Sequence, residues 1–351
     1  MDRYSKSGVN LKLARSVKAR LPLLLRNATR PEVLGEVGAF GGLFRARFAG
    51  YREPVLVASM DGVGTKLRIA VEMKRHDTVG QDLVNHCCND IAVMGADPLF
   101  FLDYIGTGKL KKHVFEEIVA GLAKGCAKAG VALLGGETAQ MPGFYANGDY
   151  DLVGTMIGVV DRRAILDGSR IRVGDVVVGL ASTGLHTNGY SLAREVLFRR
   201  LRLRVSSRPH ELGGASLGEA LLKAHRNYHP LLALLRRKNV LIHAAAHITG
   251  GGFKENIVRV LPPDCSVRIQ CGAWKIPPIF KFIQNRGGIS DAEMYRVFNM
   301  GIGMAFIAPG RSVAAIYSAA ARFKIPACTI GGVVKGKPSV LFDRLDPETR
   351  L

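Results

Sequence analysis

The 351-residue sequence lacks several features that mark particular classes of protein. No apolar run reaches the roughly 18 residues that predict a membrane-spanning helix, and the opening ten residues lack the apolar segment of a signal peptide. The six cysteines show no Cys-x2-Cys pair and no zinc-site spacing, so free thiols in a reducing compartment are the simplest interpretation. These absences predict a cytoplasmic protein without a membrane partner.

Aromatic residues and acids are also scarce. Aromatic residues make up 7% of the chain, with one tryptophan, and 29 acids face 49 lysines and arginines, which gives a formal net charge of +20. Such a charge attracts polyanions, including nucleic acid, anionic membranes and phosphorylated small molecules. A nucleic-acid surface needs basic residues clustered with aromatic side chains, and the most basic segment, 194–208, is instead typical of a solvated helix. We therefore expect no nucleic-acid partner.

Length and apolar content predict two domains with substantial cores, because 48% of the residues are hydrophobic. We expect the first domain to span residues 1–165 and the second to span 166–351. Strands and helices mix in both halves without the regular alternation of a Rossmann sheet, which predicts an α/β or α+β fold. The predicted helices are 80–95 and 113–129, and the predicted strands are 55–58, 131–136, 151–160, 176–181 and 330–334.

The stretch SMDGVGTKL, residues 59–67, follows the first predicted strand. Its glycines let a backbone approach phosphate closely and its lysine adds a positive charge. Asp61 is an anion in the same loop, which suggests that Mg²⁺ lies between carboxylate and phosphate. An ordinary strand-to-helix turn with an exposed lysine explains the stretch equally well, and the Gly-x4-Gly-Lys spacing of a Walker loop is absent.

A second informative stretch is the predicted helix 80–95, which carries Asp82, His86 and Asn89 opposite its apolar stripe. Asp, Asn and His are poor helix formers but good ligands and hydrogen-bonding groups. We favour a functional stripe over a solvated face, with Asn89 and Asp90 joining Asp61 around Mg²⁺.

Three further glycine-containing stretches carry polar residues, namely GGETAQMPG at 135–143, STGLHTNGYSL at 182–192 and HITGGGF at 247–253. Each has an ordinary alternative: a turn at Glu137, a capped loop at His186 and a core histidine at His247. Taken together, the five stretches predict one nucleotide–magnesium site that draws on both halves of the chain.

The sequence resembles the phosphoribosylformylglycinamidine cyclo-ligase (AIR synthetase) family. The resemblance runs nearly end to end through long motifs in the same order, among them SMDGVGTKL, NDIAVMGADPLFFLDYIGTGKL, GGETAQMPG, GLHTNGYSLAR and HITGGGFKENIVRVLP. It implies an N-terminal α/β domain that pairs with its twin in a homodimer to build a shared β-barrel, and a C-terminal α+β domain. It also implies ATP, Mg²⁺ and formylglycinamidine ribonucleotide (FGAM) as ligands, and it leaves open whether a monovalent cation is required.

The resemblance assigns roles to individual positions of this sequence. It places the metal at Asp61, Asn89 and Asp90. It implies catalytic roles for Asp61, Lys66, Asp90, His186 and His247. It implies that ATP, its phosphates or the substrate are bound by Gly62, Gly64, Thr65, Lys66, Glu137, Thr138, His186, Asn188, Gly250, Gly251 and Gly252.

The implied reaction is ATP-dependent closure of FGAM to 5-aminoimidazole ribonucleotide (AIR). ATP phosphorylates the formyl oxygen and leaves as ADP, and ring closure then releases that oxygen as phosphate. This chain departs from the family at its opening, where Lys6 and Asn10 replace two acids, so that segment lacks two carboxylates that could bind metal or substrate. Two alternative functions remain open. One is another ATP-dependent activity of the same superfamily, such as that of selenophosphate synthetase or thiamine-phosphate kinase. The other is a basic nucleic-acid-binding protein on this scaffold.

Overall fold

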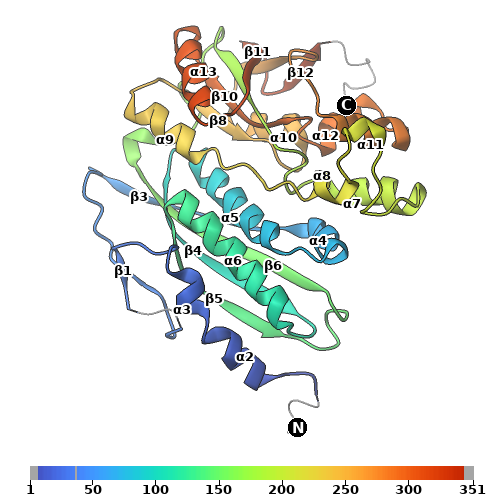
Figure 1. The fold of residues 1–351 in the computed structure, drawn as a ribbon. Helices are drawn as coiled ribbons and strands as arrows, with labels where there is room; N and C mark the ends of the chain where they lie inside the picture. Colours follow the sequence, from blue (N-terminus) through green and yellow to red (C-terminus); the bar gives the residue numbers. More distant parts are fainter. Residues whose placement is uncertain (1–6, 36–37, 344–351) are drawn as a thin grey trace. The chain divides into compact units, whose positions relative to one another are not determined.

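The computed structural model describes residues 7–35 and 38–343, and it divides the chain into two compact units (Figure 1). The N-terminal unit contains the described residues up to Ile91 together with Ala96–Arg163, and the C-terminal unit contains Ala92–Gly95 and the described residues from Ala164 onward. Lys6, one of the two departures from the family, lies outside the described residues.

A four-stranded sheet forms the centre of the N-terminal unit, with strand order β3-β6-β4-β5. Its strands are β3 (Pro54–Gly62), β4 (Asp97–Thr107), β5 (Ala132–Gln140) and β6 (Tyr150–Asp161). β6 pairs antiparallel with β3 and β4, whereas β4 and β5 are parallel and are joined by a helical crossover, as parallel neighbours require. The remaining elements are α2 (Leu11–Lys18), α3 (Leu21–Leu25), β1 (Val33–Leu34), β2 (Leu43–Phe44), η1 (Gly64–Lys66), α4 (Leu67–Met73), α5 (Asp77–Ala92), α6 (Lys112–Ala129) and η2 (Arg162–Ala164).

Helix α6 is the element that the sequence predicted best. Its apolar residues recur at helical spacing, and Phe115, Ile118 and Leu122 are all at most 3% exposed. The helix ends at Gly130, whose φ of 68° is a left-handed conformation that glycine adopts without a steric penalty. The observed helix therefore confirms the prediction for 113–129.

Helices α5 and α6 lie side by side over one face of the sheet (Figure 1). A Cβ added at Gly80 of α5 would lie 2.5 Å from the Ile118 carbonyl oxygen, and one at Gly121 of α6 would lie 2.2 Å from that of Asp77. Two glycines thus let the helix backbones touch. Since a Cβ on Gly154 of β6 would meet the Leu83 side chain of α5, alternate residues of the sheet point toward the helices.

The opposite face of the same sheet carries exposed apolar side chains. Strand β3 alternates between exposed and partly buried residues, and its Leu56 and Met60 are 61% and 70% exposed. Asp61 pairs with Gly154 and therefore points to the helix-covered side, whereas its neighbour Met60 points away from it.

The C-terminal unit contains a six-stranded sheet of order β12-β9-β11-β7-β10-β8, antiparallel except between β9 and β12. Its strands are β7 (Val176–Ala181), β8 (Ala244–His247), β9 (Cys265–Gln270), β10 (Ile302–Ala308), β11 (Ala327–Lys335) and β12 (Val340–Asp343). Its α-helices are α7 (Tyr190–Arg194), α8 (Leu217–Leu221), α9 (His229–Arg237), α10 (Gly252–Ile257), α11 (Pro278–Gly287), α12 (Asp291–Val297) and α13 (Val313–Arg322). Short helical turns are η3 (Glu195–Arg200), η4 (His210–Leu212), η5 (Val258–Val260) and η6 (Gly310–Ser312).

A buried apolar core holds α9 and α13 against this sheet. Leu231 and Leu235 of α9, Ile316 of α13, and Val178 and Phe306 of the central strands are each at most 1% exposed. At roughly 25 cal/mol per Å² of buried apolar area, such side chains supply most of the stability of the unit.

Several predicted boundaries are corrected by strand pairing. Strand β3 continues through Gly62 because its last residues pair with β6, so Asp61 lies in a strand and not in a loop. Glu137 lies inside β5, which continues to Gln140 beside β4, and not at a strand end. The strand predicted at 330–334 is not the last one, because β12 follows it and pairs with β9.

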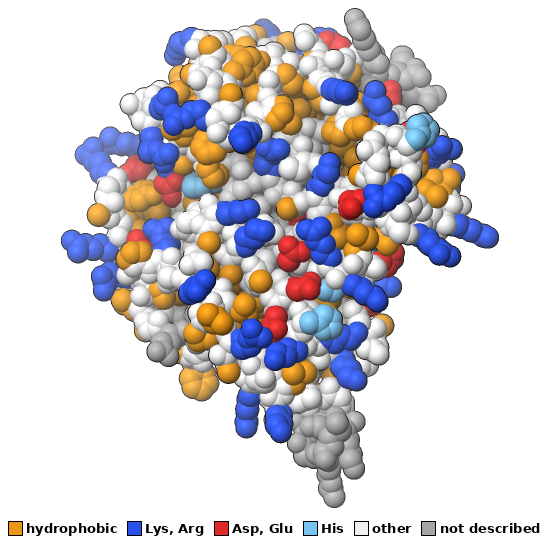
Figure 2. Space-filling view, viewed as in Figure 1, with side chains coloured by type: hydrophobic (Ala, Val, Ile, Leu, Met, Phe, Trp, Pro, Cys, Tyr) orange, Lys and Arg blue, Asp and Glu red, His pale blue; other side chains and the backbone are white. Residues whose placement is uncertain are grey.

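The surface carries many basic side chains, as the net charge of +20 requires. Figure 2 shows lysine and arginine side chains scattered over the visible face among acidic and apolar ones, not gathered in one patch. The basic segment begins as the short helix α7 and continues as the π-helical turn η3. In the described part of the chain, no helix is both long and apolar enough to cross a membrane.

Candidate active site

Two carboxylates of the N-terminal unit converge on one imidazole. Nε2 of His86 lies 3.0 Å from Oδ2 of Asp61 and 3.7 Å from Oδ2 of Asp90. His86 and Asp90 are one turn apart on α5, and Asp61 lies near the end of β3 on the side that the helix covers. The backbone N–H of Gly62 donates to Asp61 Oδ1 at 2.6 Å, and the Ser59 hydroxyl donates to Asp90 Oδ2 at 3.2 Å.

These residues fit a hard divalent cation. Carboxylate oxygens are the ligands that Mg²⁺ prefers, and the side chains of Asp61 and Asp90 are 39% and 27% exposed, so both can be reached. Asn89 precedes Asp90 on α5, and its side chain is fully buried. The structure thus brings together the two carboxylates of the predicted metal site.

Lys66 has a different environment from the one that the sequence suggested. Its Nζ lies 2.8 Å from Oδ2 of Asp82, and both side chains are fully buried. Burial lowers the pKa of the Lys66 amine, and the Asp82 carboxylate opposes that effect. The ion pair joins η1 to α5 and so fixes the chain directly after Asp61 against the helix that carries Asp90.

Glu137 and Thr138 border a cavity of about 470 Å³ in the N-terminal unit, which Lys18, Gly42 and Asp103 also line. The backbone N–H of Thr138 donates to the Glu137 carboxylate at 2.7 Å. Burial raises the pKa of Asp103 to about 7, and the nearby Glu137 carboxylate adds to that rise. Sequence reasoning missed Asp103, although an acid inside the apolar run of "FFLDY" was a usable signal.

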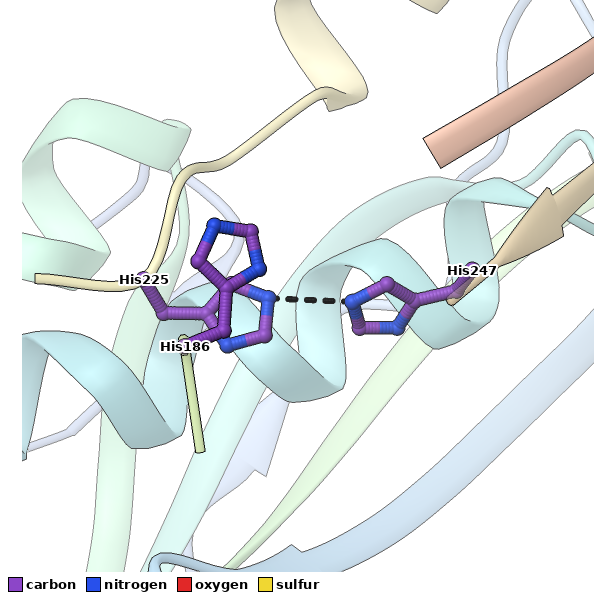
Figure 3. Close-up of side chains that lie close together, drawn as sticks. All are labelled: His186, His225 and His247. Atoms are coloured by element: carbon purple, nitrogen blue, oxygen red, sulfur yellow. Dashed lines mark hydrogen bonds between the residues drawn. The ribbon is translucent and has the colours of Figure 1, made fainter. Parts of the chain in front are cut away.

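Three histidines lie together in the C-terminal unit, and each is at most 5% exposed (Figure 3). Nε2 of His225 lies 2.9 Å from Nε2 of His247, and the ring of His186 stacks on that of His225 with centroids 3.9 Å apart. His186 and His247 were predicted site residues. His225 was not, because it belongs to the irregular segment between α8 and α9, where no periodic pattern marks it.

The loop around His186 is held in a strained conformation. His186 has a φ of 64°, which costs a residue with a side chain roughly 1–2 kcal/mol. The backbone N–H of Thr183 donates to Nε2 of His186 at 3.2 Å, which ties the ring to its own loop. Strain of this kind persists where the surroundings fix the geometry, and it gathers at functional sites.

The glycines of the loop after β8 have different surroundings. Gly252 has a φ of 59°, and a Cβ there would lie 1.9 Å from the Tyr295 carbonyl oxygen, so close backbone contact requires glycine. Gly251 has a φ of 83°. A Cβ on Gly250 would lie 3.5 Å from Nδ2 of Asn188, so this loop lies beside the loop of His186.

Comparison with known proteins decides the family. The model of the AIR synthase related protein N-terminal domain matches residues 49–160, and that of the C-terminal domain matches 172–344. The chain is 48% identical over 342 residues to the phosphoribosylformylglycinamidine cyclo-ligase of Syntrophotalea carbinolica, covering 96% of this chain and 97% of the relative. It is 46% identical to that of Geobacillus kaustophilus, covering 95% and 96%. The chain belongs to the phosphoribosylformylglycinamidine cyclo-ligase family.

Solved structures agree with the two-domain fold of this cyclo-ligase family. Thiamine-monophosphate kinase from Stenotrophomonas maltophilia superposes with a TM-score of 0.69 at 18% identity, covering 95% of this chain and 96% of that one. The hydrogenase maturation protein HypE, solved in complex with ATP, gives a TM-score of 0.64 at 17% identity, covering 93% and 90%. The predicted two-domain AIR-synthetase-like fold is therefore confirmed.

Within each unit of this cyclo-ligase family member, the structure brings predicted residues together. His86 joins Asp61 and Asp90 in the N-terminal unit. In the C-terminal unit, His225 joins His186 and His247. His86, which the sequence placed on the polar stripe, proves to be the contact between the two carboxylates.

Proposed function

We propose that this protein closes the imidazole ring of AIR from FGAM with consumption of ATP, in purine biosynthesis. The observation that carries the proposal is the 48% identity to a cyclo-ligase over 96% of the chain, with both domain models matched. Binding ATP and FGAM follows from this reaction. A cytoplasmic location stays a prediction from the sequence.

The reaction needs a leaving group on a formamide carbon. Transfer of the γ-phosphoryl group of ATP to the formyl oxygen makes that oxygen part of a good leaving group. The ribosyl-bearing nitrogen then attacks the formyl carbon and loses its proton to a base, and the C–O bond breaks with its electrons leaving on phosphate. The protein therefore has to position the reactants, neutralise phosphate charge and accept one proton.

We assign the metal to the N-terminal cluster, with Asp61 and Asp90 as carboxylate ligands and Asn89 beside them. Mg²⁺ bound there would neutralise negative charge on the phosphates of ATP. His86 holds the two carboxylates close together, and the ion pair of Lys66 with Asp82 fixes the loop between β3 and α4. Lys66 acts in this proposal chiefly by holding that loop, because its amine is fully buried.

We assign substrate positioning and proton transfer to the C-terminal cluster. His186 and His247 supply imidazoles, Asn188 supplies an amide, and the loop of Gly250 lies beside Asn188. Glu137 and Thr138 border the cavity of the N-terminal unit and are assigned to nucleotide binding, together with Gly62, Gly64 and Thr65.

We further propose that residues 1–165 form the dimerisation and nucleotide domain and that 166–351 form the second domain of the active enzyme. Support for a homodimer is the exposed apolar face of the N-terminal sheet around Leu56 and Met60. Exposed apolar patches on a sheet favour association, and pairing two such faces would build a closed barrel.

The direct test is ADP release by the purified protein in the presence of Mg²⁺, measured with and without FGAM. We expect FGAM-dependent ADP together with AIR. Protein that is inert with FGAM but turns over selenide or thiamine monophosphate would refute the proposal in favour of another member of the superfamily. The same assay with and without K⁺ decides whether a monovalent cation is required.

A further inference from the structure

Gln140, in the GGETAQMPG stretch, makes a long-range contact that the proposed function does not use. Its Oε1 accepts the backbone N–H of Asn10 at 3.0 Å, and its Nε2 donates to the Asn10 carbonyl oxygen at 3.4 Å. The two residues are 130 positions apart in the chain. One amide side chain thus binds both polar groups of a single backbone position, as a residue of an antiparallel strand would.

Asn10 is also the residue at which helix α2 begins. Its Oδ1 accepts the backbone N–H of Leu13 at 2.9 Å, which is the hydrogen bond of a helix N-cap. Asparagine and aspartate cap helices about equally well, so asparagine in place of an acid retains the cap at this position. The two bonds from Gln140 therefore hold the first turn of α2 against the end of β5.

Residues 10–25, which we call the N-terminal arm, border the cavity of about 470 Å³ in the N-terminal unit. The arm consists of Asn10, α2, α3 and the short link between the helices, and both helices contact α6. Lys18, Leu21 and Leu25 of the arm line the cavity, as Thr138 of β5 does. The position of the arm therefore helps to set the shape of this cavity.

The chain is attached to β5 on both sides of these cavity-lining residues. After α3, the backbone N–H of Leu133 donates to the Ala28 carbonyl oxygen at 2.9 Å. Before α2, Gln140 makes its two bonds to Asn10. Gln140 lies outside the set of described residues that line the cavity, although Thr138, two positions earlier and on the same face of the strand, belongs to it. Gln140 can thus influence the cavity through the arm.

We propose that Gln140 is a positioning residue that latches the N-terminal arm against the cavity, and that the latched arm raises the affinity of the cavity for ATP. An amide suits this contact because it donates and accepts at once, which a carboxylate or an aliphatic side chain cannot do. Linkage requires the reverse effect, so ATP bound in the cavity slows the opening of the arm by the same factor. The inference rests on the proposed assignment of this cavity to nucleotide binding, whereas the latch itself can be measured without a ligand.

Trypsin measures the opening of the arm, because Lys12, Arg15 and Lys18 of α2 are exposed cleavage sites. A helix resists cleavage until it opens locally. Losing two hydrogen bonds shifts such an opening equilibrium by roughly 10-fold, so we expect Gln140→Leu to speed cleavage within α2 by that factor. Gln140→Glu keeps the size and the acceptor but loses the donor, and should speed cleavage less. Gln270→Leu makes the same change at an exposed residue of β9 and is the control.

The affinity for ATP separates positioning from a purely structural role. Calorimetry should give a Kd for ATP that rises several-fold in Gln140→Leu, because the arm is latched for a smaller fraction of the time. The kcat at saturating ATP should stay within about 2-fold of the wild type, since the latch makes no contact that changes in the transition state. In the wild type, saturating ATP should slow trypsin cleavage within α2.

Each result decides one part of the proposal. Cleavage of a folded Gln140→Leu variant at the wild-type rate would overturn the latch. Faster cleavage with an unchanged Kd for ATP would overturn its coupling to the nucleotide, and a weaker Kd without faster cleavage would overturn the route through the arm. Faster cleavage and a weaker Kd in a protein that is inert with FGAM would support the latch and refute the cyclo-ligase function alone.

Discussion

Asp61 and Asp90 come from two different elements, yet both carboxylates approach the imidazole of His86. Two carboxylates held close together repel each other unless a cation or a hydrogen-bond donor lies between them. His86 can fill that place through its Nε2–H, and Mg²⁺ would fill it with two positive charges. The arrangement therefore supports the proposal that a cation binds at this cluster.

The first prediction at this scale concerns Asp61. Asp61→Asn keeps the size of the side chain and removes its charge, so we expect turnover to fall by about 100-fold or more while the fold survives. Steady-state ADP release and circular dichroism measure the two effects. Glu72→Gln, on the exposed side of α4, is the matched control and should behave as the wild type. Full activity of a folded Asp61→Asn variant would remove Asp61 from the metal site.

The second prediction concerns the buried ion pair. Lys66→Met leaves the Asp82 carboxylate buried without its partner, which typically costs about 3–5 kcal/mol in the free energy of unfolding. Urea unfolding measures this loss. Adding Asp82→Leu should restore part of the stability, because the uncompensated charge is then gone. A single Lys66→Met variant as stable as the wild type would contradict the structural role of the pair.

The third prediction is a pH dependence at Asp103. Its pKa is raised to about 7 in the folded protein, chiefly by burial, so the folded state retains the proton longer than the unfolded chain. Its contribution to stability is therefore complete below about pH 4, near the ordinary value for aspartate, and is lost as the pH rises toward 7. Asp103→Asn removes this change, so the variant should gain stability relative to the wild type between pH 4 and pH 7. Urea midpoints of both proteins at pH 5 and pH 8 measure this gain. A difference in midpoint between variant and wild type that is the same at both pH values would contradict the prediction.

At the scale of elements, the two roles proposed for strand β3 depend on the alternation of its side chains. One side carries Asp61 toward α5, while the other side leaves Leu56 and Met60 exposed. Since adjacent residues of a strand point to opposite faces, the proposed metal site and the proposed dimer face are built by neighbouring residues. A shift of one residue in the pairing with β6 would exchange the two faces.

The fourth prediction tests the dimer at this strand. Leu56→Asp places a charge in the middle of the exposed apolar face, where pairing with a second copy would bury it at high cost. We expect the wild type to be a dimer and the variant a monomer by light scattering at micromolar concentrations. Leu341→Asp on β12, where the wild-type side chain is 42% exposed, is the control and should leave the dimer unchanged. A wild type that is monomeric at every concentration would exclude the dimer.

At the scale of the whole molecule, the fifth prediction follows the oxygen atom. If ATP activates the formyl oxygen, FGAM carrying heavy oxygen in its formyl group should give phosphate with one label per turnover and none in the solvent. Mass analysis of the phosphate makes the measurement. Unlabelled phosphate together with labelled water would mean that ATP hydrolysis drives the reaction without forming a phosphorylated amide.

Much of the fold could be predicted from the sequence because its signals are local. The apolar spacing of α6 and the alternation or apolar run of each main strand depend on residues close together in the chain. The motif from Asp61 to Lys66 and the glycine loop after His247 are likewise contiguous, so they also indicated the family and most of the proposed site. Boundaries were less accurate, because β3 extends through Asp61 only by pairing with β6.

Only the tertiary structure decided which side chains touch. Asp82 neutralises Lys66 across 16 residues, and His225 contacts both His186 and His247, which the sequence separates by 61 positions. No local periodicity encodes such contacts, because they depend on how glycine-mediated helix packing and strand pairing bring separate segments together. The sequence by itself indicated the family, predicted several of the helices and strands, and singled out the residues of the proposed site. The packing of those elements determined that Lys66 is buried, that His86 lies between the two carboxylates and that His225 contacts His247.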